Sequence, residues 1–334
     1  MARTPDRRSF LLAAATMALA ACSPDQTGIG PNSETAGASA PDGPPALLSD
    51  LNGQPPVDSP AAVPVPADAQ AVGSAADAAV PVPADAQQAV GSAAQPGLVL
   101  ERAEVAKNYA GRSPRYWGME APGVLTRLPP AAPGVALTFD FCGGPGGTSA
   151  DQALLAALRQ QHIPATLFLN SRWITANQAL AKELAADPLF ELANHGTSHG
   201  PLSVTGRSAY GIPGTRNPVE VYDEIMTNDA VLTALTGKRP RLFRPGTAHL
   251  DEVSAEIVRT LGQVPVGFTI NGDGGATFPA ATVTREISRA RGGDIVICHG
   301  NHPGGGTTPG LVRALAVLKD RGETFVAFPR NVTA

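Results

Sequence analysis

Short apolar runs alternate with amphipathic segments from about residue 116 to residue 328. The runs are rich in β-branched and aromatic residues and are short enough to be strands rather than helices. They lie at residues 135–139, 165–169, 190–193, 241–243, 264–270, 295–298 and 324–328.

Amphipathic segments between these runs predict helices. Residues 151–161 and 309–321 carry leucines at helical spacing, and Asn217 can cap a third helix that has Pro218 at its first position and ends at Gly237. Regular alternation of strands and helices predicts a parallel sheet covered by helices, either doubly wound or closed as a barrel. Roughly seven strands suit a barrel slightly short of the usual eight.

The N-terminal residues have the order of an export signal. Basic residues precede an apolar segment at 10–21 that is too short to span a bilayer, and Leu-Ala-Ala then precedes Cys22. The end of this segment resembles the lipobox of bacterial lipoproteins, so we expect a signal peptide at 1–21 and a lipid on Cys22 that attaches the chain to a membrane. Because Ser23 follows the cysteine rather than Asp, the periplasmic side of the outer membrane is favoured.

A linker separates this signal from the patterned region. Residues 22–115 are dominated by Ala, Pro, Gly, Ser, Asp and Gln up to about residue 97 and contain two imperfect copies of AVPVPADAQ-AVGSAA, starting at Ala62 and Ala79. This composition buries too little apolar surface to offset the entropy of ordering, so we expect a disordered linker followed by a catalytic domain at 116–334.

Charge and cysteine content narrow the class of partner. The net charge of −4 comes with no basic cluster, which argues against nucleic acid, and we expect a monomer. Cys142 and Cys298 form either a disulfide or two thiols packed beside the site, and the sequence leaves both open.

Ionisable side chains follow the predicted strands at their carboxyl ends, which meet at one mouth of a parallel barrel. They are Asp140, His195, His199, Arg244, Asp273 and His299. The clustering predicts one site, and the four-residue spacing of His195 and His199 suits two imidazoles on one metal ion.

This set resembles the NodB-type polysaccharide deacetylases, carbohydrate esterase family 4. The matching pieces, in the family's order, are Thr138-Phe139-Asp140, His195 with His199, Arg244-Pro245, Asp273 and Cys298-His299. The resemblance covers about residues 116–330. It implies a deformed (β/α) barrel and a divalent-metal hydrolase, with Zn²⁺ expected and Co²⁺ or Mn²⁺ as alternatives, that removes N-acetyl or O-acetyl groups from a polysaccharide.

Roles follow from this chemistry. Asp140 would take a proton from the attacking water, and His299 would give one to the departing nitrogen. Arg244 would keep Asp140 ionised, and Asp273 would hold Arg244 or His299. We expect substrate contacts from Asn301, from the backbone N–H near Gly143 and from the ring of Trp173.

The sequence departs from the family at Phe141, which stands where the family has a metal-binding aspartate. Three replacements for this ligand are open. Asp140 itself binds the metal, or Asp151 reaches the metal across the glycine-rich loop at residues 142–151, or a water molecule takes the ligand position.

Three functions therefore remain. The leading one is deacetylation of an envelope or extracellular polysaccharide such as peptidoglycan. The others are a carbohydrate-binding lipoprotein without turnover and a hydrolase of a non-sugar amide.

Overall fold

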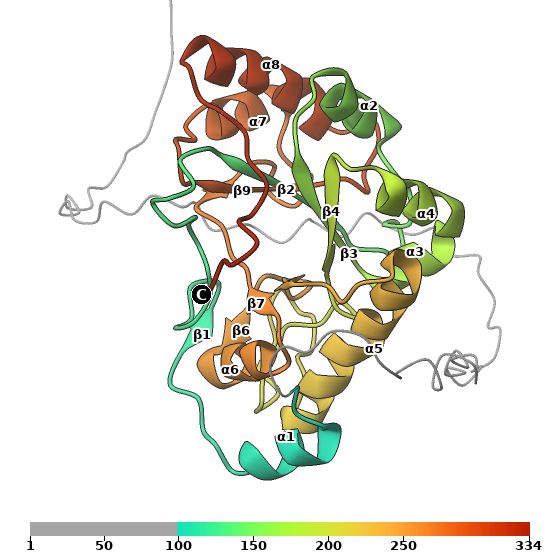
Figure 1. Cartoon of the computed structure of the whole chain (residues 1–334), viewed down its shortest axis with the longest axis vertical. Coiled ribbons are helices and arrows are strands. Elements are labelled where there is room, and N and C mark those ends of the chain that lie inside the picture. The colour runs from blue at the N-terminus through green and yellow to red at the C-terminus, as the bar shows by residue number, and fades with distance from the viewer. Residues whose placement is uncertain (1–98) are drawn as a thin grey trace, which may run out of the picture. The chain divides into compact units, whose positions relative to one another are not determined.

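The computed structural model describes residues 99–334 (Figure 1). The predicted signal peptide, the lipidation site Cys22 and both repeats lie outside these residues. Within the described part of the chain, no helix has the length and hydropathy needed to cross a bilayer.

Helices and strands alternate through most of the described chain. The helices are α1 (Arg102–Asn108), α2 (Gln152–Gln160), α3 (Ser171–Ala176), α4 (Gln178–Ala186), α5 (Pro218–Thr236), α6 (Glu252–Thr260), α7 (Ala280–Ile287) and α8 (Thr307–Asp320). The strands are β1 (Trp117–Gly118), β2 (Ala136–Phe141), β3 (Ala165–Leu169), β4 (Phe190–Asn194), β5 (Leu242–Phe243), β6 (Leu250–Asp251), β7 (Val264–Pro265), β8 (Ile270–Asn271) and β9 (Ile295–His299).

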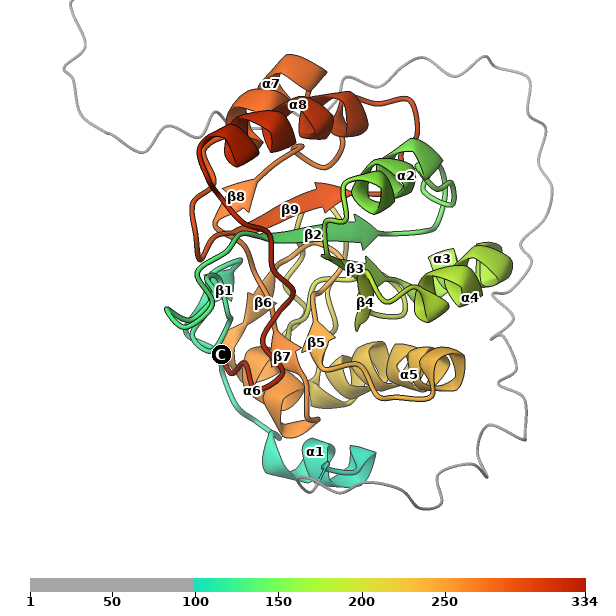
Figure 2. The same cartoon turned by 45° about the horizontal axis from the view of Figure 1, so that its top comes forward.

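The main sheet has seven strands in the order β7-β5-β4-β3-β2-β9-β8, and every neighbouring pair is parallel. Figure 2 shows the strands following an arc from β8 to β7, with α2 to α5, α7 and α8 on its outer side. The prediction of a parallel α/β fold with about seven strands is confirmed.

The arc closes most of the way into a barrel. β7 and β8 lie on opposite edges of the sheet, yet only residues 266–269 join them. Five residue steps from Pro265 to Ile270 span at most about 18 Å, so the two edges lie no further apart than that at these residues. Leu125 bridges to Val266 near one edge and Arg127 to Asp294 near the other, which places residues 125–127 between the two edges. The fold is therefore an incomplete barrel.

Several expected strands differ from those observed. Residues 264–270, expected as one strand, form two short strands because the chain leaves one edge to reach the other. The expected strand at 324–328 is wrong, since its pairing with the sheet is a single bridge between Val135 and Phe325. β1 and β6 form a separate antiparallel pair that the sequence pattern did not indicate.

The ordered domain begins before residue 116. α1 lies within the range expected to be linker, and its Val105 is buried in one apolar cluster with Val221 and Ile225 of α5. The helix end signals are confirmed at α5, where the Asn217 side chain accepts the N–H groups of residues 219 and 220, and Gly237 follows with φ 71°.

The pleat of β2 sorts its side chains between two surroundings. Leu137, Phe139 and Phe141 belong to the apolar cluster that packs under the outer helices. Thr138 and Asp140 face the barrel interior, where both contact the buried Arg244. Successive residues of a strand point to opposite faces, and this alternation delivers the carboxylate to the inside.

Candidate metal and acid–base site

The barrel interior brings together the predicted ionisable residues at the carboxyl ends of four strands. Asp140 lies one residue before the end of β2 and His299 ends β9, and the two residues pair in register on these neighbouring strands. His195 follows β4 and Arg244 follows β5, so groups more than 100 residues apart in the chain share one site.

His195 presents one free ring nitrogen to this site. Its Nδ1 lies 2.9 Å from the carbonyl oxygen of Arg244, which can only accept, so Nδ1 carries the hydrogen. In the neutral ring, Nε2 then holds a lone pair, and it lies 3.7 Å from the Cys142 Sγ and 3.6 Å from the Asp140 Oδ2. A carbonyl partner on the far nitrogen is the usual way a metal-binding histidine is oriented.

Protons compete for that nitrogen. Burial lowers the pKa of His195, but the Asp140 carboxylate and Cys142 outweigh it and the pKa is raised overall. A metal ion at Nε2 must therefore displace a proton in part of the population, which weakens binding as the pH falls.

His199 is aimed at the site by a strained and tightly held loop. Its backbone has φ 67°, in the left-handed region that few residues other than glycine adopt. The buried carboxylate of Glu224, on α5, accepts the N–H groups of Thr197, Ser198 and His199. The Nε2 of His199 is buried and has no hydrogen-bond partner among the described residues, as expected for a ligand atom.

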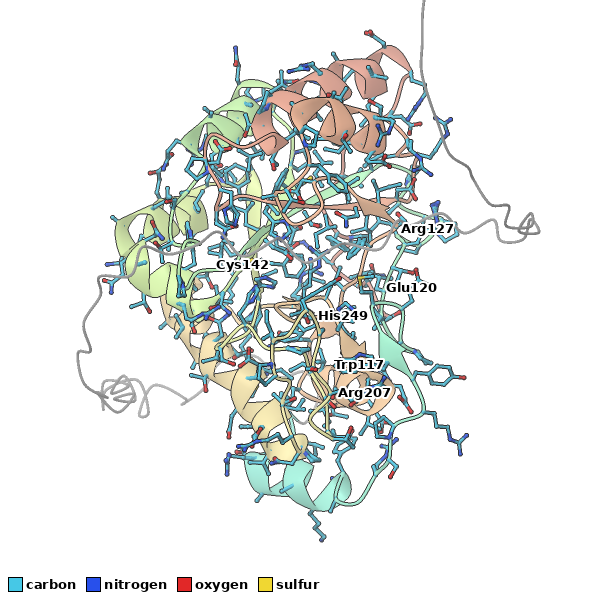
Figure 3. The ribbon with its side chains drawn as sticks, turned by 180° about the vertical axis from the view of Figure 1, so that it is seen from behind. Trp117, Glu120, Arg127, Cys142, Arg207 and His249 are labelled. Carbon is cyan, nitrogen blue, oxygen red and sulfur yellow. The ribbon has the colours of Figure 1, made fainter. Side chains whose placement is uncertain are left out.

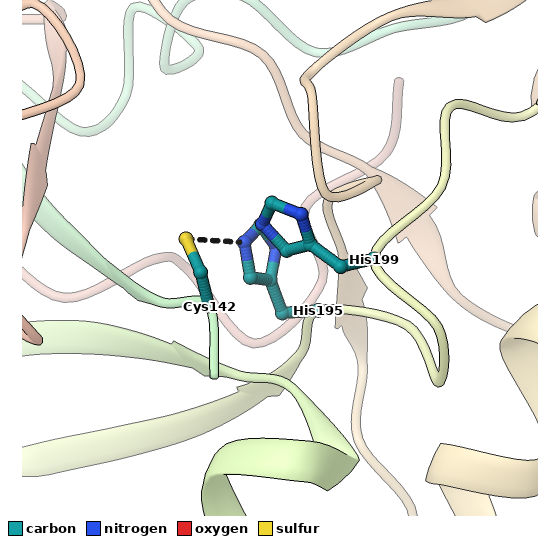
Figure 4. Close-up of side chains that lie close together, drawn as sticks. All are labelled: Cys142, His195 and His199. Carbon is teal, nitrogen blue, oxygen red and sulfur yellow. Dashed lines mark hydrogen bonds between the residues drawn. The ribbon is translucent and has the colours of Figure 1, made fainter. Parts of the chain in front are cut away.

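Cys142 completes a group of three donors (Figure 4). Its Sγ and one nitrogen each of His195 and His199 all lie within 4.8 Å of one another. Burial raises the pKa of the Cys142 thiol, but its contact with the His195 imidazole and the neighbouring imidazoles of His199 and His299 lower it well below its ordinary value. One sulfur and two imidazole nitrogens are donors that zinc accepts, and the orphan nitrogen of His199 supports the fit of a divalent ion.

Asp140 lies beside this group and is not a member of it. Its Oδ1 accepts a hydrogen bond of 2.8 Å from the Arg244 Nη1, and both side chains are buried. Burial raises the pKa of Asp140, but the charge of Arg244 outweighs it and the pKa lies below the usual carboxyl value. Asp140 is therefore ionised at neutral pH.

His299 has the opposite protonation. Its Nδ1 lies 2.9 Å from the Asp273 Oδ1, and its backbone N–H donates to the other oxygen of the same carboxylate. Burial lowers the pKa of His299, but the Asp273 charge and hydrogen bond raise it well above the ordinary imidazole value. Of the two partners expected for Asp273, the structure gives it His299.

Four predicted assignments disagree with the structure. Asp151 is a helix cap: its Oδ1 accepts from the N–H of Leu154 and its Oδ2 from the Thr308 hydroxyl, so neither oxygen reaches the donor group. Trp173 is fully buried, packs on Phe141 at 4.7 Å between ring centroids and cannot stack on a sugar.

The other two concern the glycine-rich loop. The N–H of Gly143 donates to the carbonyl of Gly147, so it is not free to stabilise an oxyanion. Asn301 is fully buried and its side-chain amide also donates to the Gly147 carbonyl, which makes it a support of the loop.

The two cysteines are not bonded to each other. Cys142 faces the barrel interior, whereas Cys298 lies in the apolar cluster under the helices, on the other side of the sheet. The two thiols are therefore free, and only Cys142 lies beside the site as expected.

Sequence reasoning missed Cys142 as a donor and Glu224 as the residue that holds the histidine loop. The signal for Cys142 was the two-residue repeat of a strand: a side chain two positions after Asp140 shares its face. Glu224 gave no local signal, because its partners lie 24 to 27 residues earlier in the chain.

Polar and aromatic side chains form a rim on the face shown in Figure 3. The Trp117 ring lies 6.0 Å from the His249 ring and has the Arg207 guanidinium 5.1 Å from its centroid. Tyr210 is 66% exposed and packs edge-on against the same histidine. The exposed Tyr210 ring and the half-buried Trp117 ring are accessible in a way that the fully buried Trp173 is not.

Comparison with known proteins agrees with this geometry. Residues 128–266 match the model of the polysaccharide deacetylase family.

Two curated relatives carry the name of uncharacterized proteins. YlxY of Bacillus subtilis is 25% identical over 174 residues, and the match covers 51% of this chain and 49% of YlxY. A Streptomyces coelicolor protein is 27% identical over 190 residues, covering 56% and 67%. The chain thus spans about half the length of the first relative.

Solved structures share the fold. A CE4 family pseudoenzyme from Bacillus anthracis superposes with a TM-score of 0.51 at 22% identity, over 62% of this chain and 67% of its own. A peptidoglycan N-acetylglucosamine deacetylase gives 0.51 at 24% identity, over 61% and 90%. Residues 128–266 are thus similar to a polysaccharide deacetylase domain, and the solved structures share the incomplete-barrel fold.

Proposed function

We propose that this protein is a metal-dependent hydrolase that removes acetyl groups from an N-acetylated or O-acetylated polysaccharide of the cell envelope. One observation carries the proposal: an ionised carboxylate and a protonated imidazole both border one group of three metal-binding donors. A hydrolase that must deprotonate water and protonate a poor leaving group needs both.

His195 and His199 would hold the ion, with Cys142 as the third neighbouring donor. A divalent ion bound there would polarise the acetamide carbonyl and lower the pKa of a nearby water. The remaining steps fall to side chains of the chain itself.

Asp140 is placed to accept the proton of the attacking water. Arg244 keeps it ionised and orients it, because the guanidinium holds one carboxylate oxygen at 2.8 Å and leaves the other directed at His195. Two contacts hold Arg244 in turn. Its Nη1 donates to the Thr138 hydroxyl at 2.9 Å, and its Cζ lies over the Phe168 ring, 4.2 Å from the ring centroid.

His299 is placed to give a proton to the departing sugar nitrogen, which cannot leave as an anion. Asp273 holds the Nδ1 hydrogen, so the other ring nitrogen is directed away from the carboxylate. The Thr307 hydroxyl donates to Asp273 at 2.9 Å and fixes that carboxylate.

The substrate class rests on the family match and on the fold shared with a peptidoglycan N-acetylglucosamine deacetylase. The rim of Trp117 and Tyr210 supports a polysaccharide, because aromatic faces stack on sugar rings. Export and lipid attachment at Cys22 stay predictions from the sequence, and they would bring the domain to envelope glycans.

Acetate release tests the proposal. The zinc-loaded full-length protein should free acetate from N-acetylglucosamine oligomers or glycan strands, and Asp140→Asn should lower that rate by about 10²–10⁴-fold with unchanged circular dichroism. An Asp140→Asn variant as active as the parent would contradict its role as the base.

Because a pseudoenzyme shares this fold, two further outcomes of the assay are defined in advance. Protein that binds the glycan and metal but frees no acetate would be a binding module, and protein active on small amides but not on oligosaccharides would be a non-sugar amide hydrolase. The first result would overturn the proposed activity, and the second would overturn the proposed substrate class.

A further inference from the structure

We propose that Cys142 binds the metal directly as a thiolate, so that the centre is a Cys-His-His site selective for thiophilic ions such as Zn²⁺, Cd²⁺ and Co²⁺ over Mn²⁺ and Mg²⁺. The inference rests on the metal site of the proposed function but not on its substrate. The proposal names the third protein ligand, since Phe141 stands where the family has a metal-binding aspartate.

The spacing of the donors fits one tetrahedral ion. Zn–S and Zn–N bonds of about 2.3 and 2.05 Å at a tetrahedral angle separate the two ligand atoms by about 3.6 Å. The Cys142 Sγ and His195 Nε2 are 3.7 Å apart, so an ion between them needs almost no movement of either side chain. The His199 nitrogen lies within 4.8 Å of both atoms.

The alternation of side chains along β2 explains why the residue at position 142, and not the one at 141, can bind the metal. Phe141 points into the helix layer, where its ring packs on Trp173 and an added Cβ on Gly300 would lie 2.2 Å from it. A carboxylate at position 141 with this orientation would be buried among apolar groups. Cys142, two residues after Asp140, returns to the interior beside the imidazoles.

The other oxygen donors nearby are already committed. Asp140 has one oxygen on Arg244 and is outside the three-donor group, and both oxygens of Asp151 serve the start of α2 and the Thr308 hydroxyl. Sulfur is therefore the remaining anionic donor of the group, and soft sulfur ligands favour zinc-like ions over the harder Mn²⁺ and Mg²⁺.

Cobalt spectroscopy tests the ligand without measuring turnover. The full-length protein is stripped with a chelator and titrated with Co²⁺, and we expect a near-ultraviolet sulfur-to-cobalt charge-transfer band. Cys142→Ser should lose the band, whereas Cys298→Ser, which changes a cysteine of the apolar cluster, should keep it. An unchanged band in Cys142→Ser would overturn the proposal.

Metal preference gives a second measurement. In competition between Zn²⁺ and Mn²⁺ the parent should favour Zn²⁺, and Cys142→Asp should shift the ratio of dissociation constants towards Mn²⁺ by at least about tenfold, since an oxygen replaces the soft ligand. An unshifted ratio would contradict a metal–sulfur bond. If Cys142→Asp fails to fold, protection of Cys142 from iodoacetamide by Zn²⁺, followed by peptide mapping of the parent, still decides the question.

The outcomes also separate this inference from the proposed function. A cobalt–sulfur band without acetate release keeps the ligand and rejects the deacetylase, and acetate release without the band does the reverse. Chelated protein that still frees acetate, combined with an inactive Cys142→Asp, would make the thiolate a nucleophile and overturn the ligand assignment.

Discussion

Two residues of the site, Asp140 and His299, are held in opposite protonation states, and the neighbour with the largest effect differs between them. Arg244 lowers the pKa of the first against its burial, and Asp273 raises the pKa of the second against its burial. Water in an open site would screen both effects, so the buried setting strengthens the influence of these neighbouring charges. A base and an acid can thus coexist in one cavity at neutral pH.

Asp273→Asn should move the alkaline limb of the pH–rate profile. In the parent His299 keeps its proton above the ordinary imidazole range, and activity is lost as the pH rises through that raised pKa. Without the carboxylate the pKa falls, so the loss comes at lower pH, and the rate at neutral pH drops by up to the 10²–10⁴-fold of a positioned acid.

The measurement is acetate release from pH 5 to 10. Asp187→Asn serves as the control, because Asp187 pairs with Arg159 outside the donor group. An alkaline limb that stays in place in Asp273→Asn would contradict the role of this carboxylate.

At the scale of elements, α5 positions the histidine loop that follows β4. Glu224 gathers the N–H groups of that loop on one carboxylate, which is a strong arrangement because each bond is charge-assisted. Gly196 is required by it: the backbone there has φ 75°, and a Cβ would lie 2.5 Å from the Glu224 Oε1. The metal donor His199 is thus oriented by a helix that carries no ligand.

Glu224→Gln should weaken metal binding. An amide keeps one acceptor oxygen but turns an NH₂ group towards backbone donors, so the loop relaxes and the affinity for Zn²⁺ falls by about 10–100-fold. Isothermal titration measures this. The control is Glu286→Gln on α7, where Glu286 pairs with Arg285 and Arg289 at the surface, and it should leave the affinity for Zn²⁺ unchanged. Equal Zn²⁺ affinities of the Glu224→Gln and Glu286→Gln variants would show that the histidine loop keeps its shape without the Glu224 carboxylate.

At the scale of the whole molecule, Arg244 ties the interior of the barrel together. Its guanidinium donates to Asp140 on β2 and to the carbonyls of Val266 and Gly267, in the segment that crosses from one sheet edge to the other. The same side chain that orients the base thus supports closure of the arc.

Arg244→Met should lower the free energy of unfolding by about 3–5 kcal/mol, because it leaves the Asp140 carboxylate buried without a partner. Adding Asp140→Asn should restore part of that loss, since the remaining group is neutral. Urea unfolding gives the values. The control is Arg159→Met, which breaks a partly exposed ion pair with Asp187 and should change the free energy of unfolding by about 1 kcal/mol or less. An equally small effect of Arg244→Met would contradict the stabilising role of Arg244 in the barrel interior.

The strands that carry the site were predictable where the apolar run was long. The expected bounds of β3 match the structure, and those of β2, β4 and β9 differ by one or two residues. The prediction failed at 264–270 and 324–328, because a run of apolar residues has the same pattern whether it continues a strand, crosses the barrel or packs beside it. At β2 the expected end at Phe139 fell before Cys142, so its shared face with Asp140 was not used.

The sequence by itself determined the order and type of most elements and the residues at the strand ends, because these depend on side-chain periodicity and helix end signals within a few residues. The tertiary structure decided which of them meet: Cys142 joins His195 and His199, Asp273 pairs with His299, and Asp151 and Trp173 turn to structural roles. Those contacts depend on the curvature of the sheet and on groups up to 157 residues apart in the chain, and no local pattern encodes such separations.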